Sequence, residues 1–188
     1  MISFQLKDRE IRTQKRAFVV GIVNVTNDSF YEKSRGGIER ALNLIEEGAD
    51  IIDLGAESTR PGFTEVSVTD EIRRLTPVIR EIRRSSDIPI SIDTRKKSVF
   101  EACFFEGADI LNDVSAFSFD SENAKFCSIH NNPVILTHTF PHGRENQDDI
   151  INITFDEYSF LSEISLFFEN RISFLKNSGF DLSKVIID

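Results

Sequence analysis

The sequence has no tryptophan, one methionine, three histidines and two cysteines among its 188 residues. Cys103 and Cys127 fall within helix-like segments and form neither a metal-ligand spacing nor a disulfide framework. We therefore expect buried thiols in the reducing environment of the cytoplasm. His138 and His142 lack the further ligands that a zinc site requires, so a structural role is favoured for both.

Basic residues are also scarce, with 22 Lys and Arg against 31 Asp and Glu and a net charge of -9. This balance argues against a general nucleic-acid-binding protein, although it leaves room for a local pocket that binds a small anion. No run of about 18 apolar residues is present, so no membrane span is expected. The first ten residues, MISFQLKDRE, are too polar for a signal peptide. The composition predicts one soluble globular domain over residues 1–188.

Short apolar runs alternate regularly with helical patterns along the chain. The runs predict strands at residues 17–25, 51–56, 88–93, 110–114, 133–138 and 184–188. Helical patterns fall at residues 36–50, 68–84, 96–109, 121–132 and 155–180, with Gly48 ending the first and Thr69 as a candidate N-cap of the second. The segments EEGADIIDLGA and FEGADILNDVSA nearly repeat each other, which indicates stacked βα units and a parallel sheet covered by helices.

Two α/β architectures fit this alternation, an open doubly wound sheet and an eight-stranded (βα)8 TIM barrel. An open sheet concentrates its site at one switch point, but here polar residues recur at successive strand ends: Asn24, Asp53, Glu57, Asp93, Asn112, Asp113 and His138. No G-x-G-x-x-G motif follows the first strand. Both observations favour an incomplete barrel, with about six strands present and the last two units missing after Asp188, the end of the predicted sixth strand.

Several of these strand ends carry residue types that suit the binding of an anion and a metal ion. Asn24 and Asp28 are oxygen ligands of the kind that Mg²⁺ prefers, with an ordinary turn as the alternative. In ESTRPG, Arg60 is held extended by the following proline and can contact a phosphate with two nitrogen atoms. The alternative for this segment is a surface loop.

The third and fourth predicted strands end on acidic and amide side chains. Asp93 could accept a hydrogen bond from a ring N–H group or balance a developing cation, whereas an N-cap role is the alternative, more so for Thr94. Asn112 and Asp113 have the same ambiguity. The charged runs RRSSD and TRKK are interpreted as solvated helix faces.

Four segments in this order, GIVNVTNDSF, GADIIDLGAESTRPG, ISIDTRK and GADILNDVSA, closely resemble the dihydropteroate synthase family. The resemblance extends from about Phe18 to Asp188. It implies a βα barrel that condenses 6-hydroxymethyl-7,8-dihydropterin pyrophosphate with p-aminobenzoate and releases pyrophosphate. The pyrophosphate would leave first, or nearly so, and the arylamine would then attack a pterin methylene cation.

The resemblance also implies roles for individual residues. Asn24 would be the Mg²⁺ ligand, and Arg60 and Asp93 the catalytic residues. The implied substrate-binding residues are Thr59 and Arg60 near the diphosphate, Asp93 and Asn112 in the pterin pocket, and the pterin-binding Asp188.

The sequence departs from the family pattern in three places. Asn27 replaces a proline and Glu32 lies in an altered first loop, while Thr137 and Thr139 flank His138 where the family has methionines. The family continues after Asp188 with a lysine in a Ser-Arg-Lys motif and an Arg-x-His pair. We therefore expect an enzyme that is inactive until a second chain completes the barrel. The alternatives are a non-catalytic remnant and an open-sheet module that binds a pterin or a phosphate.

Overall fold

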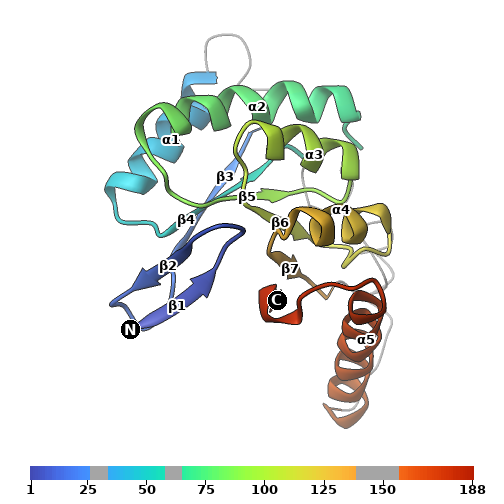
Figure 1. The fold of residues 1–188 in the computed structure, drawn as a ribbon. Coiled ribbons are helices and arrows are strands. Elements are labelled where there is room, and N and C mark those ends of the chain that lie inside the picture. Colours follow the sequence, from blue (N-terminus) through green and yellow to red (C-terminus); the bar gives the residue numbers. More distant parts are fainter. Residues whose placement is uncertain (26–33, 58–64, 139–156) are drawn as a thin grey trace.

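The structure is a computed structural model that describes residues 1–25, 34–57, 65–138 and 157–188 (Figure 1). Six strands form one sheet: β3 (Val20–Asn24), β4 (Ile51–Gly55), β5 (Ile90–Asp93), β6 (Ile110–Asp113), β7 (Val134–Leu136) and β8 (Val185–Ile187). All five pairings are parallel, and the spatial order of the strands is their order in the chain. A doubly wound sheet would reverse its order at a switch point, so the prediction of barrel-type winding is confirmed.

The helices follow the strands in alternation. They are α1 (Ser34–Glu46), α2 (Val68–Ser85), α3 (Lys97–Phe105), α4 (Glu122–His130) and α5 (Glu157–Asn177), with a 3₁₀ turn, η3 (Leu182–Lys184), before β8. Figure 1 shows α1 to α4 arching in chain order over one face of the sheet, and consecutive helices contact one another. Among the described residues, no helix is both long and apolar enough to cross a membrane.

The ends of α1 and α2 depend on particular side chains. Gly48 lies just beyond α1 with a φ of +94°, as expected for a glycine that ends a helix. The N-cap of α2 is Ser67, and the prediction of Thr69 is wrong. The Ser67 hydroxyl accepts the Asp70 N–H (3.1 Å) and donates to the Asp70 carboxylate (2.8 Å), and this local exchange fixes the start of the helix.

The main core lies between the sheet and its helices. Alternate strand residues point outward and are fully buried there, among them Ile52, Leu54, Ile92 and Leu111. Cys103 and Cys127 are free thiols buried in this layer, as predicted. Burial raises the pKa of Cys103 to about 12, so this thiol remains protonated and unreactive at neutral pH.

An N-terminal hairpin covers the N-terminal ends of the strands on the inner face of the sheet, the face turned away from the helices. It consists of β1 (Ile2–Gln5) and β2 (Glu10–Thr13), which pair antiparallel and were not predicted. Leu6, in the turn, packs against Ile51 and Ile110 at the starts of β4 and β6. Lys184 donates from Nζ to the carbonyl of Leu6 (3.1 Å) and joins the hairpin to η3. The inner face is therefore apolar at its N-terminal end.

Both edges of the sheet are open within the described residues, where β3 pairs only with β4 and β8 only with β7. Along β3, residues on the buried outer face alternate with residues on the inner face. The inner-face residues Val20, Ile22 and Asn24 are exposed. Ile22 is 64% exposed and Ile187, on the other edge strand, is 51% exposed. Apolar side chains at these positions would be covered if the sheet closed into a barrel.

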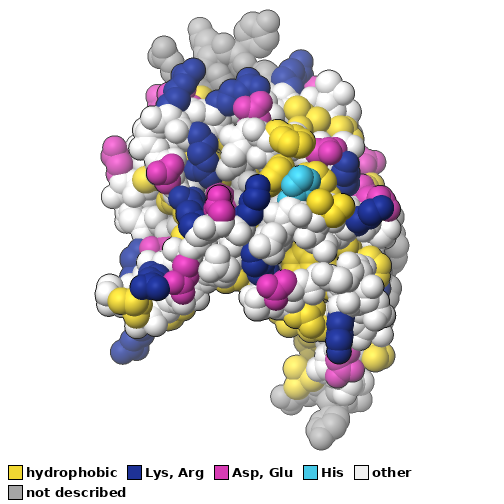
Figure 2. All heavy atoms as spheres, in the orientation of Figure 1, with side chains coloured by type: hydrophobic (Ala, Val, Ile, Leu, Met, Phe, Trp, Pro, Cys, Tyr) yellow, Lys and Arg dark blue, Asp and Glu magenta, His cyan; other side chains and the backbone are white. Residues whose placement is uncertain are grey.

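The outer surface carries both signs of charge, which are interspersed on the face seen in Figure 2. Several are ion-paired, such as Lys15 with Asp50 (3.0 Å). Arg83 of the RRSSD run is not fully solvated, because it is half-buried and pairs with Asp109 at 2.7 Å. Surface pairs such as Lys15–Asp50 contribute about 0–1 kcal/mol each, so the fold depends chiefly on its cores.

Candidate active site at the C-terminal ends of the strands

Four residues lie level with one another across neighbouring strands. The strand register places Asn24 beside Gly55, Gly55 beside Asp93, and Asp93 beside Asn112. Each is the last or next-to-last residue of its strand, so the predicted strand-end residues Asn24, Asp93 and Asn112 form one row. This row occupies the end of the inner face at which βα barrels place their sites.

Gly55 leaves space between two oxygen-bearing side chains. A Cβ atom at this position would lie 3.3 Å from Oδ2 of Asp93 and 3.7 Å from Oδ1 of Asn24. The two oxygens therefore face the same small volume, which any larger residue at position 55 would occupy. A glycine is needed here for close approach rather than for an unusual backbone angle.

These two oxygens suit Mg²⁺ as part of its ligand set. Mg²⁺ is commonly held by one or two protein oxygens and completes its shell with water and substrate phosphates. Within the described residues no cluster of three or more His, Cys, Asp or Glu side chains could hold a metal ion. The two oxygens fit one side of a magnesium shell, with Asn24 as the predicted ligand and Asp93 beside it.

Asp53 lies one layer below this row on the same face of β4 and is 6% exposed. The Asn112 amide donates from Nδ2 towards both of its carboxylate oxygens, at 3.4 Å each. Oδ1 of Asn112 is buried without a hydrogen-bond partner among the described residues. Burial raises the pKa of Asp53, and the Asp188 carboxylate raises it further. The buried Asp53 carboxylate and the buried Oδ1 atom of Asn112 thus present acceptors on the inner face, and the exposed Asp188 carboxylate lies close enough to affect Asp53.

Asp188 is held at the end of β8 by its backbone. Its N–H donates to the carbonyl of Leu136 (2.9 Å), and its own carbonyl accepts the N–H of His138 (2.9 Å). The ring of His138 packs edge-on against Phe167, with 4.8 Å between ring centroids. This contact agrees with the structural role that the sequence favoured for His138.

Asp113 points away from this row and stabilises the turn after β6. Its carboxylate accepts from the Ser115 N–H (2.8 Å), the Ser115 hydroxyl (2.6 Å) and the Phe117 N–H (3.1 Å). Ala116 and Phe117 adopt positive φ angles of 46° and 65° in this turn. Asp113 therefore has a structural role in this turn and does not cap α4, whose N-cap residue is Ser121, whereas Asn112 is the inward-facing residue.

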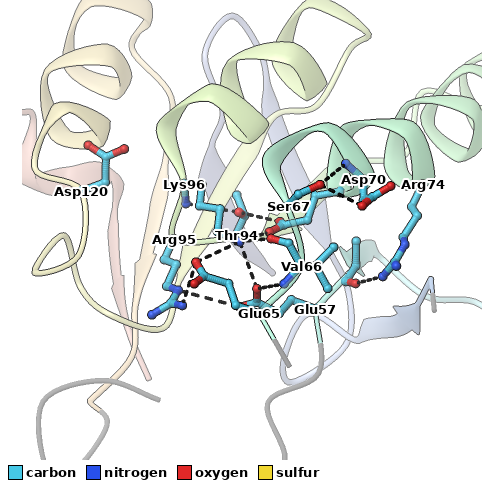
Figure 3. A network of polar contacts seen from close by, with 12 residues as sticks. Glu57, Glu65, Val66, Ser67, Asp70, Arg74, Thr94, Arg95, Lys96 and Asp120 are labelled. Carbon is cyan, nitrogen blue, oxygen red and sulfur yellow. Dashed lines mark hydrogen bonds and ion pairs between the residues drawn. The ribbon is translucent and has the colours of Figure 1, made fainter. Parts of the chain in front are cut away.

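Three predicted residues, Asp28, Thr59 and Arg60, lie outside the described residues, as do the altered first loop and His142. Their roles stay predictions. The described residues that flank positions 58–64 are Glu57 and Glu65, and both take part in the polar network of Figure 3.

This network shows that the interpretation of TRKK as a solvated face is wrong for its central residues. Arg95 and Lys96 are 4% and 6% exposed. The Lys96 ammonium group donates to Glu57 (3.0 Å), Glu71 (2.6 Å) and the carbonyl of Val66 (2.5 Å) (Figure 3). Sequence alone could not distinguish these buried charges from surface ones, because their partners come from distant segments.

Thr94 belongs to the same network and does not cap α3, whose N-cap residue is Lys96. The Thr94 hydroxyl donates to Glu71 (3.0 Å) and accepts the Lys96 N–H (3.2 Å). Burial opposes ionisation of Glu57, but the Val66 N–H and the Lys96 ammonium outweigh it and hold the pKa of Glu57 below its usual range. The carboxylate is therefore ionised at neutral pH.

The fold has counterparts among known proteins. The family model for pterin binding enzymes matches residues 20–188. The chain belongs to the pterin-binding enzyme family. This membership agrees with the resemblance carried by the sequence motifs.

Curated relatives within the family include the dihydropteroate synthase of Synechocystis sp., 36% identical over 182 residues that make up 93% of this chain and 60% of the relative. The dihydropteroate synthase of Streptococcus pyogenes serotype M3 is 38% identical over 179 residues, or 92% of this chain and 62% of the relative. The chain thus spans about 60% of the length of these curated relatives.

Solved structures of dihydropteroate synthases share the fold. The Coxiella burnetii enzyme in complex with pteroic acid superposes with a TM-score of 0.83 at 30% identity, covering 100% of this chain and 66% of the other. The Xanthomonas albilineans enzyme with 4-aminobenzoic acid gives a TM-score of 0.84 at 33% identity, covering 99% and 65%. Pterin-binding enzymes of known structure thus contain the described sheet as part of a longer chain.

Proposed function

We propose that this chain supplies the pterin and diphosphate sites of a dihydropteroate synthase. The observation that carries the proposal is the row of Asn24, Gly55, Asp93 and Asn112 above the buried Asp53. The similar enzymes of known structure with pteroic acid or 4-aminobenzoic acid support the substrate class. The substrates would be 6-hydroxymethyl-7,8-dihydropterin pyrophosphate and p-aminobenzoate.

The acceptors in this interior match the donor edge of a pterin ring. A pterin presents an exocyclic amino group and ring N–H groups on its pyrimidine side, and each needs an acceptor once water is removed. The Asn112 Oδ1 atom is buried and unbonded among the described residues, and the Asp53 and Asp188 carboxylates are close enough to influence one another. A ring that donates several hydrogen bonds would therefore satisfy groups that the protein leaves open.

In the proposed reaction, the bond between the pterin methylene carbon and the diphosphate oxygen breaks, and the diphosphate leaves with the electron pair. The arylamine nitrogen then forms a bond to this carbon and loses a proton. Asp93 would stabilise the positive charge on the pterin, and Arg60 would contact the departing diphosphate. Mg²⁺ bound at Asn24 would offset the negative charge on the leaving group.

Turnover, in this proposal, requires further βα units that close the sheet, which a second chain could supply. The support is the open inner face of β3, where Ile22 is 64% exposed. Binding of a pterin without turnover is the second candidate function, and the same open edge favours it. The free, buried cysteines support the cytoplasm as the place of action.

A binding measurement tests the proposal before any assay of turnover. Calorimetry with Mg²⁺ should show saturable binding of dihydropterin pyrophosphate to the chain, weakened by Asn112→Ala. The matched control is Asn131→Ala, a position at the C-terminus of α4. A folded chain that binds neither this substrate nor the free pterin would overturn the proposal. Labelled p-aminobenzoate should then enter dihydropteroate only when a segment that completes the barrel is added.

A further inference from the structure

Six buried polar side chains form a cluster outside the proposed pterin site. They are Glu57, Glu71, Arg74, Thr94, Arg95 and Lys96, each less than 8% exposed. Charges in such a position must be paired, because an uncompensated buried charge costs several kcal/mol. The proposed reaction uses none of these side chains directly.

Lys96 is the centre of this cluster because its acceptors come from three separate places. Glu57 follows the end of β4, Val66 precedes α2, and Glu71 lies in the first turns of α2 (Figure 3). Lys96 itself follows β5. One ammonium group thus joins both sides of the connection between β4 and α2 to the neighbouring strand.

Further contacts attach the same connection to its surroundings. The Arg95 guanidinium lies 3.7 Å from Glu57 and 3.4 Å from Glu65, and it stacks on the ring of Phe119 at 4.0 Å. Arg74 donates to the carbonyl of Ala56 (2.8 Å). Buried positive charges therefore contact residues on both sides of positions 58–64.

We propose that Lys96 is a positioning residue that fixes the separation of Glu57 and Val66. This inference rests on the proposed function, since Thr59 and Arg60 lie between these two residues in the sequence. The Lys96 contacts set where the chain leaves β4 and where it enters α2. They thereby fix the two described ends of the segment that contains Thr59 and Arg60, although Lys96 itself touches no substrate.

Three variants separate this role from a merely structural one. Lys96→Met removes the ammonium group and leaves Glu71 without its cation. The double variant Lys96→Met/Glu71→Met also removes that carboxylate, and apolar replacement of buried ion pairs is often neutral for stability. Lys97→Met is the matched control, because the adjacent lysine pairs with Glu101 on its own helix and lies over the ring of Phe126 (5.3 Å), and neither of these two residues belongs to the cluster.

Hydrogen exchange monitored by mass spectrometry gives the first readout. We expect faster exchange in peptides that cover residues 57–66 for both Lys96 variants, and exchange at wild-type rates for Lys97→Met. Peptides from β6 should be unchanged in the double variant. Wild-type exchange at residues 57–66 in the double variant would overturn the proposal.

The second readout is the affinity of each variant for two ligands that differ only in the diphosphate. We expect both Lys96 variants to bind dihydropterin pyrophosphate about tenfold more weakly, the loss of roughly one hydrogen bond to a charged group. Binding of 6-hydroxymethyl-7,8-dihydropterin, which lacks the diphosphate, should be little changed. Equal losses for both ligands would overturn the positioning role. If the wild type binds neither ligand, the proposed function fails, and the exchange readout still decides whether Lys96 fixes Glu57 and Val66.

Discussion

Two polar clusters lie at the same end of the sheet, and they differ in how their charges are balanced. Around Lys96, buried carboxylates meet buried cations at 2.6–3.7 Å. Around Asp53 there are carboxylates and an amide. Among the described residues, no lysine or arginine forms an ion pair with Asp53 or Asp188. In the first cluster the buried carboxylates have cations from the same chain, whereas the second leaves acceptors available.

The difference teaches how polar groups in one fold divide between structure and binding. A buried network whose members satisfy one another makes the local geometry rigid and has no capacity left for a ligand. A buried group with a raised pKa and an unbonded neighbour lowers stability until a ligand supplies the missing donors, which is typical of binding sites. Asp53 and Asn112 fit the second description.

The largest expected effect on stability comes from breaking the cluster around Lys96. Lys96→Met should lower the free energy of unfolding by about 3–5 kcal/mol, because it leaves the buried carboxylate of Glu71 without its cation. Urea denaturation measures this change, with Lys97→Met as the control. Lys96→Met/Glu71→Met should recover part of the loss. If Lys96→Met lost no more free energy of unfolding than Lys97→Met, the cluster around Lys96 would not be buried in solution.

The next effect concerns the space between the two oxygens of the candidate site. Gly55→Ala places a methyl group 3.3 Å from Oδ2 of Asp93, so this carboxylate must move by a few tenths of an ångström. We expect dihydropterin pyrophosphate to bind about tenfold more weakly, with a smaller change in stability.

Gly37→Ala serves as the control for this prediction. It lies in α1, where the nearest atom to an added Cβ is at an ordinary 3.7 Å, and alanine is the better helix former by about 1 kcal/mol. Unchanged binding by Gly55→Ala would mean that Asp93 does not face the ligand across this gap.

The pH dependence of the free energy of unfolding tests the cluster around Asp53. The pKa of Asp53 in the folded chain is raised above its ordinary 3.8, chiefly by burial. Folding therefore favours the protonated carboxyl, and its contribution to stability falls as the pH rises from 3.8 through the folded-state pKa. Asp53→Asn should be more stable than the wild type at pH 7, and this advantage should vanish below pH 3.8. An advantage that is independent of pH would contradict the assignment.

The smallest effect is expected at the open edge beside the candidate site. Ile22→Ala should change the free energy of unfolding by only about 0.5 kcal/mol, because this side chain is 64% exposed. Ile92→Ala, at a fully buried position on β5, should cost about 2–5 kcal/mol. Similar losses for the two variants would show that the inner face of β3 is covered in solution.

Sequence patterns predicted the six strands and their parallel pairing, and they identified Asn24, Asp93 and Asn112 as strand-end residues, because each of these features depends on local chemistry. Alternating apolar runs and helical periodicities identify βα units, and polar residues at strand ends identify the open end of a barrel. The hairpin at residues 2–13 was missed because its strands are only four residues long and mostly exposed. Ser67 was missed as the cap of α2 because Thr69, two residues later, is also a favoured cap by residue type.

The sequence by itself determined the order of the elements, the family and which residues reach the C-terminal ends of the strands. Only the tertiary structure decided that Lys96 is buried rather than solvated, that Asp53 lies beneath Asn112, and that Gly55 separates Asn24 from Asp93. The physical reason is that burial and charge balance depend on partners 25 to 59 residues away in the chain. A local pattern specifies the strand on which a side chain lies, but the packing of several strands and helices determines what that side chain meets.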